Sequence, residues 1–150
     1  MPQSFGALYF HLVFSTKNRL PLITPQIQPR LFEYVGGILA QRKSVLLAAG
    51  GIADHVHLLV SLSREACIAD TLRDIKSISS GWVHDEFPRS SDFAWQSGYA
   101  AFSVSHSNLD SVRAYLASQA QHHRGKTFKE EYLEFLKRHD MQYDERYVWD

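Results

Sequence analysis

The chain has 150 residues, of which 45% are hydrophobic and 13% aromatic, and this is enough for one domain with its own core. Its 16 basic and 16 acidic residues balance. That balance excludes the uniformly basic surface of a general nucleic-acid binder, but not a local DNA site. The single cysteine, Cys67, excludes an intramolecular disulfide bond and is expected to be a small buried residue rather than a nucleophile.

No apolar run approaches the roughly 20 residues that span a bilayer, and the N-terminus lacks the basic and apolar regions of a signal peptide. We therefore expect a soluble, cytoplasmic protein without a membrane partner. No repeat or low-complexity segment interrupts the chain, so residues 1–150 are expected to form a single domain.

The first half of the chain predicts a strand, a helix and two further strands. Side-chain character alternates over residues 7–14, which is the period of a strand. A helix is expected over residues 24–43, because Thr24 can cap it and apolar side chains then recur every three or four positions. Residues 45–52 and 55–62 have strand character again, and the short connection between them predicts an antiparallel pair.

The second half predicts three helices and one strand. Apolar spacing indicates a helix over residues 68–87, and a strand is expected over 99–105. A third helix is expected from Ser107 to Gly125. A fourth should begin at the capping box Thr127-Phe128-Lys129-Glu130 and end near His139.

The order of these elements is the βαββαβ pattern of a ferredoxin-like α+β sandwich. We expect a four-stranded antiparallel sheet covered by helices, with additional C-terminal helices. Because this fold serves many functions, the function must be argued from particular side chains.

Two pairs of residues have spacings that can build a reactive site. His55 and His57 lie two apart on a predicted strand, so their imidazoles emerge on one face and form half of a possible divalent-metal site. Tyr115 and Gln119 lie four apart on the predicted third helix, so they share a face. Taken alone, either pair has a structural explanation, since Tyr115 borders an apolar stripe and eight histidines easily produce one such pair by chance.

The combination of these pairs resembles the single-tyrosine HUH transposases of small insertion sequences, a family that includes transposases associated with repeated palindromes. The likeness extends over nearly the whole chain. The segments that carry it are Tyr9–Lys17, Gly51–Val60, Gly98–Ser105, Val112–Leu116, His122–Arg124 and Thr127–Tyr132.

The resemblance implies a role for four residues. His55 and His57 match the two histidine ligands of a divalent metal, Gln119 matches the third protein ligand, and Tyr115 matches the nucleophile. Mg²⁺ or Mn²⁺ is the implied cofactor, since the site has no thiolate of the kind that closed structural zinc sites use. The phenol would attack a phosphodiester and displace its 3′ oxygen, leaving a 5′-phosphotyrosine that can later be rejoined.

The resemblance also implies the partners, which are single-stranded DNA with a hairpin and a second copy of the chain. Phosphate contacts are expected from four basic side chains: Lys17, Arg19, Arg73 and Lys76. His11 is expected to be a structural histidine, and no role is assigned to His106, His122 or His123.

Four alternative functions share part of this residue pattern. A histidine-triad hydrolase needs a further histidine where the chain has Leu59, and a two-histidine phosphoesterase needs His-x-Thr or His-x-Ser repeats that are missing here. A domesticated protein that only binds DNA hairpins would have no need of Tyr115. A host enzyme tied to repeated palindromes, which cuts without moving its own gene, stays open.

Overall fold

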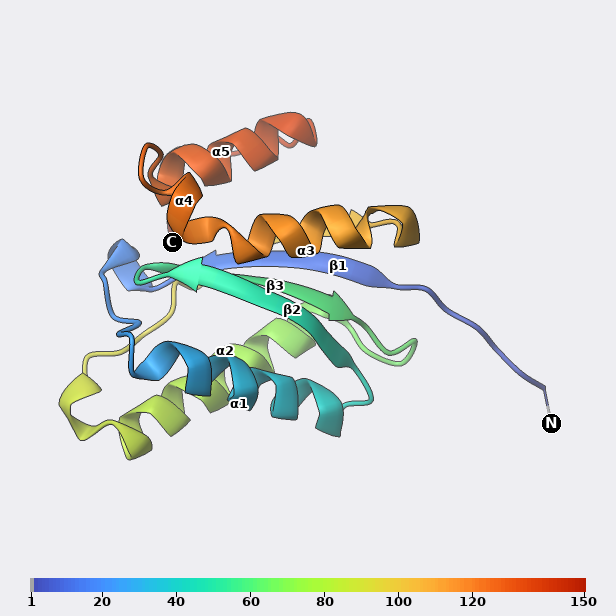
Figure 1. Cartoon of the computed structure of the whole chain (residues 1–150), viewed down its shortest axis with the longest axis horizontal. Coiled ribbons are helices and arrows are strands. Elements are labelled where there is room, and N and C mark those ends of the chain that lie inside the picture. The colour runs from blue at the N-terminus through green and yellow to red at the C-terminus, as the bar shows by residue number, and fades with distance from the viewer. Residues whose placement is uncertain (1) are drawn as a thin grey trace.

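The computed structural model describes residues 2–150 as one sheet with helices on both faces (Figure 1). The four strands are antiparallel and have the order β2-β3-β1-β4. Their bounds are Tyr9–Ser15 (β1), Val45–Ile52 (β2), His55–Ser61 (β3) and Ala100–Val104 (β4). The ferredoxin-like α+β fold expected from the sequence is confirmed, with β1 and β3 at the centre of the sheet.

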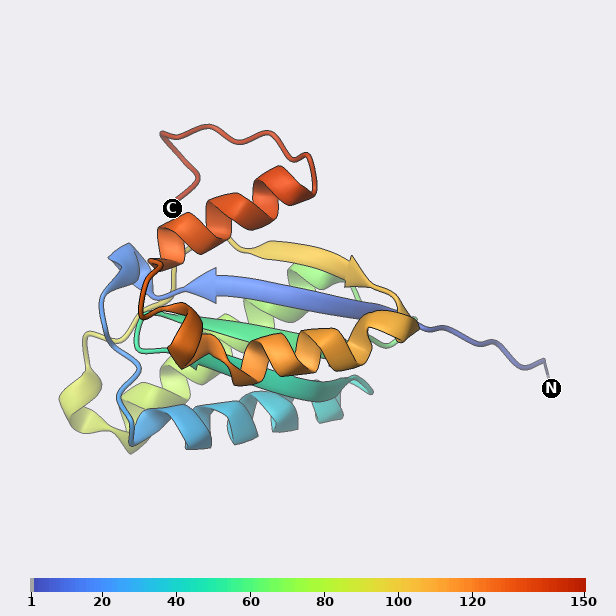
Figure 2. The same ribbon diagram turned by 45° about the horizontal axis from the view of Figure 1, so that its top comes forward.

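The helices divide between the two faces of this sheet. α1 and α2 cover one face, and α3, α4 and α5 cover the other (Figures 1 and 2). The chain beyond α5 returns along the outside of that helix (Figure 2). The helices are α1 (Ile27–Gln41), α2 (Ile68–Glu86), α3 (Leu109–Ala117), α4 (Gln119–His122) and α5 (Phe128–Arg138).

Each face of the sheet packs against its own apolar cluster. Leu12, Phe14 and Leu58 belong to the larger one, beneath α1 and α2. Val13 and Phe102 belong to the smaller one, beneath α5. Strand residues therefore alternate between two cores, which explains why β1 and β3 consist largely of buried side chains.

Several predicted boundaries were wrong by a few residues, and one error bears on the site. The third helix does not run from 107 to 125. Residues His106–Asn108 form a 3₁₀ turn, α3 ends at Ala117, and Ser118 separates it from the short α4. The Ser118 hydroxyl donates to the carbonyl of Tyr115, 3.1 Å away, and so offers that backbone group a partner outside the regular helical ladder.

The remaining differences are local. α1 begins at Ile27, after a turn in which Thr24 accepts from the Ile27 amide. Cys67 is exposed at the start of α2, so the expectation that it is buried was wrong. None of the helices formed by residues 2–150 has both the length and the apolar character that crossing a bilayer requires.

Candidate metal centre and nucleophile

β3 carries His55 and His57 to the sheet face that α3, α4 and α5 cover. The strand lies between β2 and β1, so its backbone is bonded on both sides. Both imidazoles are 0% exposed, while Val56 and Leu58 point into the opposite core. A central strand therefore holds the histidine pair in a fixed, buried position.

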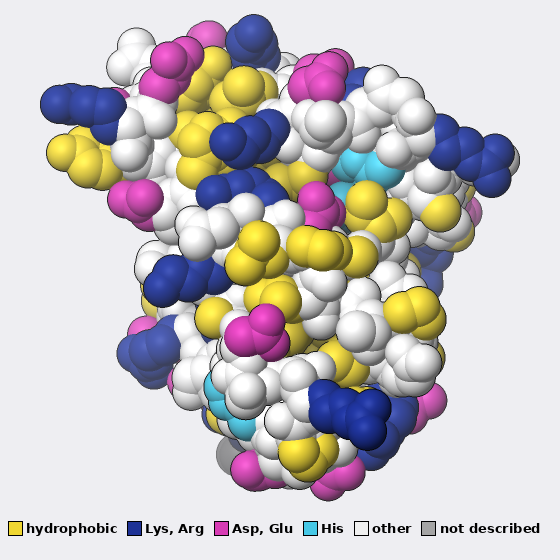
Figure 3. Space-filling view, turned by 90° about the vertical axis from the view of Figure 1, so that its left-hand side faces the viewer, with side chains coloured by type: hydrophobic (Ala, Val, Ile, Leu, Met, Phe, Trp, Pro, Cys, Tyr) yellow, Lys and Arg dark blue, Asp and Glu magenta, His cyan; other side chains and the backbone are white. Residues whose placement is uncertain are grey.

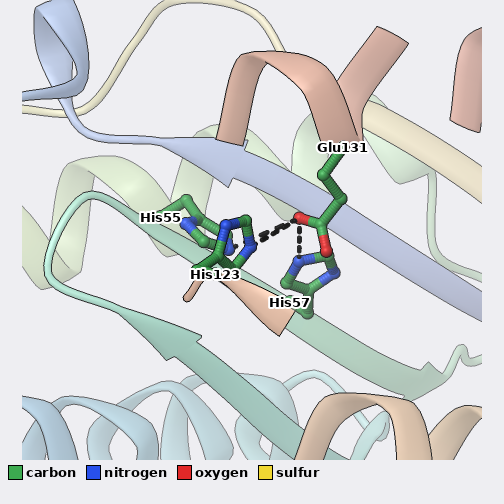
Figure 4. A group of neighbouring side chains, drawn as sticks. All are labelled: His55, His57, His123 and Glu131. Carbon is green, nitrogen blue, oxygen red and sulfur yellow. Dashed lines mark hydrogen bonds and ion pairs between the residues drawn. The ribbon is translucent and has the colours of Figure 1, made fainter. Parts of the chain in front are cut away.

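α5 adds a carboxylate to which the sequence analysis assigned no role. Glu131 is 1% exposed, and its Oε1 atom lies among three imidazoles (Figure 4). This oxygen is 2.9 Å from Nε2 of His57, 3.2 Å from Nε2 of His123 and 3.5 Å from Nε2 of His55. The four ligand atoms all lie within 4.8 Å of one another, so two sequence-distant segments converge on one point.

Tyr115 and Gln119 reach the same carboxylate. The Tyr115 hydroxyl donates to Oε2 of Glu131, and the amide nitrogen of Gln119 donates to that oxygen over 3.1 Å. The amide oxygen of Gln119 faces Nε2 of His55 at 2.9 Å and Nε2 of His123 at 3.1 Å. The four residues predicted from the sequence are thus brought together, although α3 ends between Tyr115 and Gln119.

The outer nitrogens of the three imidazoles also have partners, and these orient the rings. A carboxylate or carbonyl that accepts from Nδ1 fixes the tautomer in which Nε2 carries a lone pair. The contacts at Nδ1 are His55 to Oδ1 of Asp54 (2.7 Å), His123 to the carbonyl of Lys126 (2.6 Å) and His57 to Nε2 of His11 (2.8 Å).

Neutral imidazoles have too few N–H groups to donate to all the oxygen atoms that face them in this arrangement. His55 and His123 each face oxygen acceptors at both ring nitrogens, yet a neutral imidazole has one N–H. A cation between the Nε2 atoms and the oxygens of Gln119 and Glu131 would satisfy these lone pairs. Bonds of about 2.1 Å place neighbouring ligand atoms roughly 3.0–3.4 Å apart, close to the separations observed here. The donor set therefore fits a divalent metal ion.

Burial sets the protonation of the surrounding groups. It lowers the pKa of His57, and it lowers that of His11 to about 3 with a smaller contribution from the neighbouring His57. Burial, together with the Glu131 carboxylate, raises the pKa of Tyr115. Burial alone would raise the pKa of Glu131 as well, but hydrogen bonds from His57 and Tyr115 outweigh it and hold that pKa well below its usual range. At neutral pH the phenol is therefore the donor and the carboxylate the acceptor.

The four predicted phosphate contacts have different surroundings. Lys17 and Arg19 form the 3₁₀ turn after β1, and Arg19 donates to the carbonyl of Trp149 over 2.7 Å. Arg73 is exposed beside two aspartates of its own helix. Lys76 donates to three consecutive backbone carbonyls before β4, and burial lowers its pKa to about 8. In this structure Lys76 supports a loop and has no hydrogen free for a phosphate.

Basic side chains do not gather into one block on the face drawn in Figure 3. Lysines and arginines alternate there with acidic and apolar side chains, and histidine reaches the surface beside them. Charges of both signs are therefore present on this face. Binding of DNA to this face would therefore depend on a few individual lysine or arginine side chains.

The family model described as "Transposase IS200 like" matches residues 4–119, which is more than three quarters of the chain and includes both predicted pairs. The chain belongs to the IS200-like transposases. As a transposase it is an enzyme of DNA recombination that cuts DNA. The matched segment ends at Gln119, so His123 and Glu131 lie beyond it.

Three similar proteins are of the same kind. The ISDra2 transposase TnpA of Deinococcus radiodurans is 24% identical over 117 residues, which cover 75% of this chain and 84% of that protein. A crystal structure described as a transposase of D. radiodurans R1 has a TM-score of 0.62 at 22% identity, over 79% of this chain and 96% of the other. A REP-associated tyrosine transposase bound to a REP hairpin has a TM-score of 0.52 at 15% identity, over 77% and 66%. At these identities the structures show that the fold is shared.

Two members of this transposase's cluster, His123 and Glu131, were not predicted from the sequence. Glu131 had a usable signal, because it falls three residues after Phe128 and four before Phe135, on the apolar stripe of its helix. A carboxylate on such a stripe needs buried partners. His123 had no comparable signal, since it follows α4 in an irregular segment.

Proposed function

We propose that this transposase cleaves and rejoins single-stranded DNA through Tyr115, with a divalent metal held by His55, His57 and Gln119 together with His123 and Glu131. The observation that carries the proposal is the hydrogen bond from the Tyr115 hydroxyl to Glu131, whose other oxygen faces three imidazoles. Through these contacts, the Glu131 side chain connects the proposed nucleophile to the proposed metal ligands.

When bound, the metal would neutralise charge on a phosphate oxygen and so assist displacement at phosphorus. The donor set, with three imidazoles, supports Mn²⁺ over Mg²⁺, because Mg²⁺ prefers an all-oxygen shell. Zn²⁺ also accepts imidazoles, so the choice of ion is part of the test.

The protein side chains account for the transfer of the phenol proton. Tyr115 is protonated at neutral pH, because burial and Glu131 raise its pKa. As its oxygen bonds to phosphorus and the bond to the 3′ oxygen breaks, the phenol proton passes to Oε2 of Glu131, and the 3′ oxygen leaves as a hydroxyl after gaining a proton from solvent. The strand then carries a 5′-phosphotyrosine, and the reverse reaction rejoins it.

The substrate we infer is the single-stranded end of an element with a hairpin, acted on by a homodimer. The inference rests on the resemblance and on a relative described as bound to a REP hairpin. Tyr115 lies against His57 of its own chain, with ring centres 5.7 Å apart, which supports a site assembled within one subunit.

The decisive experiment uses labelled single strands from DNA flanking the gene, incubated with Mn²⁺ or Mg²⁺ and run on a denaturing gel. We expect a covalent protein–DNA band that requires the metal. Tyr115→Phe should lower its yield by at least about a thousandfold while the strand still binds. Tyr147→Phe is the control, because Tyr147 is 62% exposed and is not among the side chains that bond to Glu131.

An adduct that persists in Tyr115→Phe would contradict the proposed nucleophile. Hairpin binding without any adduct, across strands from both element ends, would instead favour a protein that only binds DNA hairpins. An adduct that forms equally well in excess chelator would contradict the role of the metal.

A further inference from the structure

A cavity of about 360 Å³ is lined by Tyr115 but by none of the ligand-cluster residues His55, His57, His123 and Glu131. Its lining residues come from β1 and β4 on the sheet and from α3 and the end of α5 above it. Tyr115 lines the cavity and also contacts the ligand cluster, so one side chain separates the two. Nothing in the proposed reaction uses this space.

The lining combines flat rings, hydroxyls and one cation. Phe102 stacks on both His139 and Phe135, with ring centres 4.3 and 5.4 Å apart, so these rings partly cover one another. Phe102 and Phe135 are buried, and the rings that remain accessible in the cavity are those of the exposed His139 and the partly buried Tyr115. Ser103 and Ser111 add hydroxyl groups at the rim. Rings that bind a flat face and polar groups that bind its edge are the features with which proteins hold an unpaired nucleobase.

Arg138 supplies the charge. Its guanidinium lies 5.4 Å from the centre of the Phe135 ring and acts on Tyr115 as a nearby positive charge. Within residues 2–150 it forms no ion pair with a carboxylate. A cation without an acidic partner, next to a residue that must meet a phosphate, is suited to bind phosphate.

We propose that this cavity holds one unpaired nucleotide of the DNA strand, next to the scissile phosphate, with its base among the rings and its phosphate on Arg138. The proposal rests on the proposed function, because a DNA strand that brings its scissile phosphate to Tyr115 must also place the adjoining nucleotide beside this tyrosine. The ligand cluster that Tyr115 contacts is buried, whereas the cavity that Tyr115 lines is open to solvent. The volume lies at the lower end of small-ligand sites and suits one nucleotide rather than several.

The first test does not need cleavage. Isotope-labelled protein is titrated with each deoxynucleoside 5′-monophosphate in chelator, and amide shifts are followed by NMR. We expect saturable shifts at Ser103, Ser111 and His139 with at least one nucleotide, and none of comparable size with inorganic phosphate. Ser111→Trp, which fills the cavity from an exposed position on α3, should abolish them.

Arg138→Ala and Lys137→Ala form a matched pair, since both residues are exposed in the last turn of α5 and only Arg138 lines the cavity. Arg138→Ala should weaken nucleotide binding at least roughly fivefold, and Lys137→Ala should leave it unchanged. Absence of saturable shifts in the wild-type protein would overturn the proposal, as would shifts that survive Ser111→Trp.

The second test uses the covalent-adduct assay with an abasic residue placed in turn at each position near the cut. An abasic residue at one position next to the scissile phosphate should raise the KM of the wild-type protein by roughly fivefold or more. The same abasic residue should cause no further rise in the KM of Ser111→Trp. Equal effects at every position would overturn the nucleotide pocket while leaving the tyrosine mechanism standing. Loss of the adduct on every strand would count against the proposed function, and the NMR result would still decide the pocket.

Discussion

Glu131 is the residue on which nucleophile and metal ligands depend together. Its Oε2 accepts from Tyr115 and Gln119, and its Oε1 lies 2.9–3.5 Å from the three Nε2 atoms. A glutamine at this position removes the negative charge but fills the same volume and still accepts hydrogen bonds through one oxygen. Glu131→Gln therefore tests metal binding and proton acceptance separately from packing.

We predict that Glu131→Gln weakens Mn²⁺ binding at least roughly tenfold and slows adduct formation further, since the variant loses an anionic ligand and the acceptor of the phenol proton. Calorimetric titration of the ion gives the first quantity, and single-turnover gels at saturating Mn²⁺ give the second. Glu134→Gln, one turn along α5 and half exposed, should change neither. Unchanged Mn²⁺ affinity in Glu131→Gln would exclude this carboxylate from the metal site.

The sequence predicted part of this site for a clear physical reason. His55 and His57 follow from the two-residue period of a strand, which fixes the side-chain face regardless of tertiary structure. The convergence of Glu131 and His123 on them depends on how the irregular segment after α4 folds back, and no local period encodes that. His11 was expected to have a structural role. Its hydrogen bond to Nδ1 of His57 gives it one, because this bond helps to hold the His57 ring in place.

At the scale of elements, α3 approaches the sheet more closely than a side chain would allow. Gly50 on β2 pairs across the ladder with His57, and a Cβ on Gly50 would stand 2.0 Å from the carbonyl oxygen of Leu116. The missing side chain lets the backbone of α3 rest on the strand beside the histidine. The position of Tyr115, one residue before Leu116, follows from this contact.

Gly50→Ala should therefore push α3 outward, destabilise the fold by about 1–3 kcal/mol and slow adduct formation by roughly a hundredfold, because small displacements of a reacting group are costly. Denaturant unfolding and the gel assay measure the two effects. Gly37→Ala is the control: nothing lies within 4 Å of its added Cβ in α1, and it should stabilise the protein by about 0.5–1 kcal/mol. Wild-type rates in Gly50→Ala would show that α3 is not placed by this contact.

Strand and helix order were predictable because apolar periods specify them locally, and the capping box before α5 formed as expected. The break at Ser118 was not predictable in the same way. Four-residue spacing suggested that Tyr115 and Gln119 share a helical face, yet their side chains meet because both bond to Glu131. A tertiary contact here takes the place of the helical geometry that the spacing implied.

For the whole molecule, the sheet separates a mainly apolar layer from a layer that buries ionisable groups. The layer beneath α1 and α2 consists mostly of hydrophobic side chains, with the hydroxyls of Thr71 and Ser79 buried among them, whereas the opposite face buries His11, His55, His57, Gln119 and Glu131. Stability in the metal-free protein must therefore depend on pH, because protonating a buried histidine requires either unfolding or a buried charge.

We predict that the free energy of unfolding, measured with denaturant in chelator, falls by about 2 kcal/mol or more between pH 7.5 and 5. The pKa of His11 is 6.5 in the unfolded chain and about 3 in the folded protein, and that of His57 is lowered as well. A histidine with a lowered folded pKa contributes fully above pH 6.5 and loses that contribution as the pH falls toward the folded value. The pH window stays above the ordinary carboxyl pKa of 4.5, so Glu131 does not dominate the change in stability.

His11→Phe should flatten the pH dependence of the unfolding free energy, although it lowers that free energy at pH 7.5. His106→Gln, at an exposed position, should leave the slope unchanged. Equal slopes in the wild-type protein and His11→Phe would show that this histidine is not held neutral by the fold.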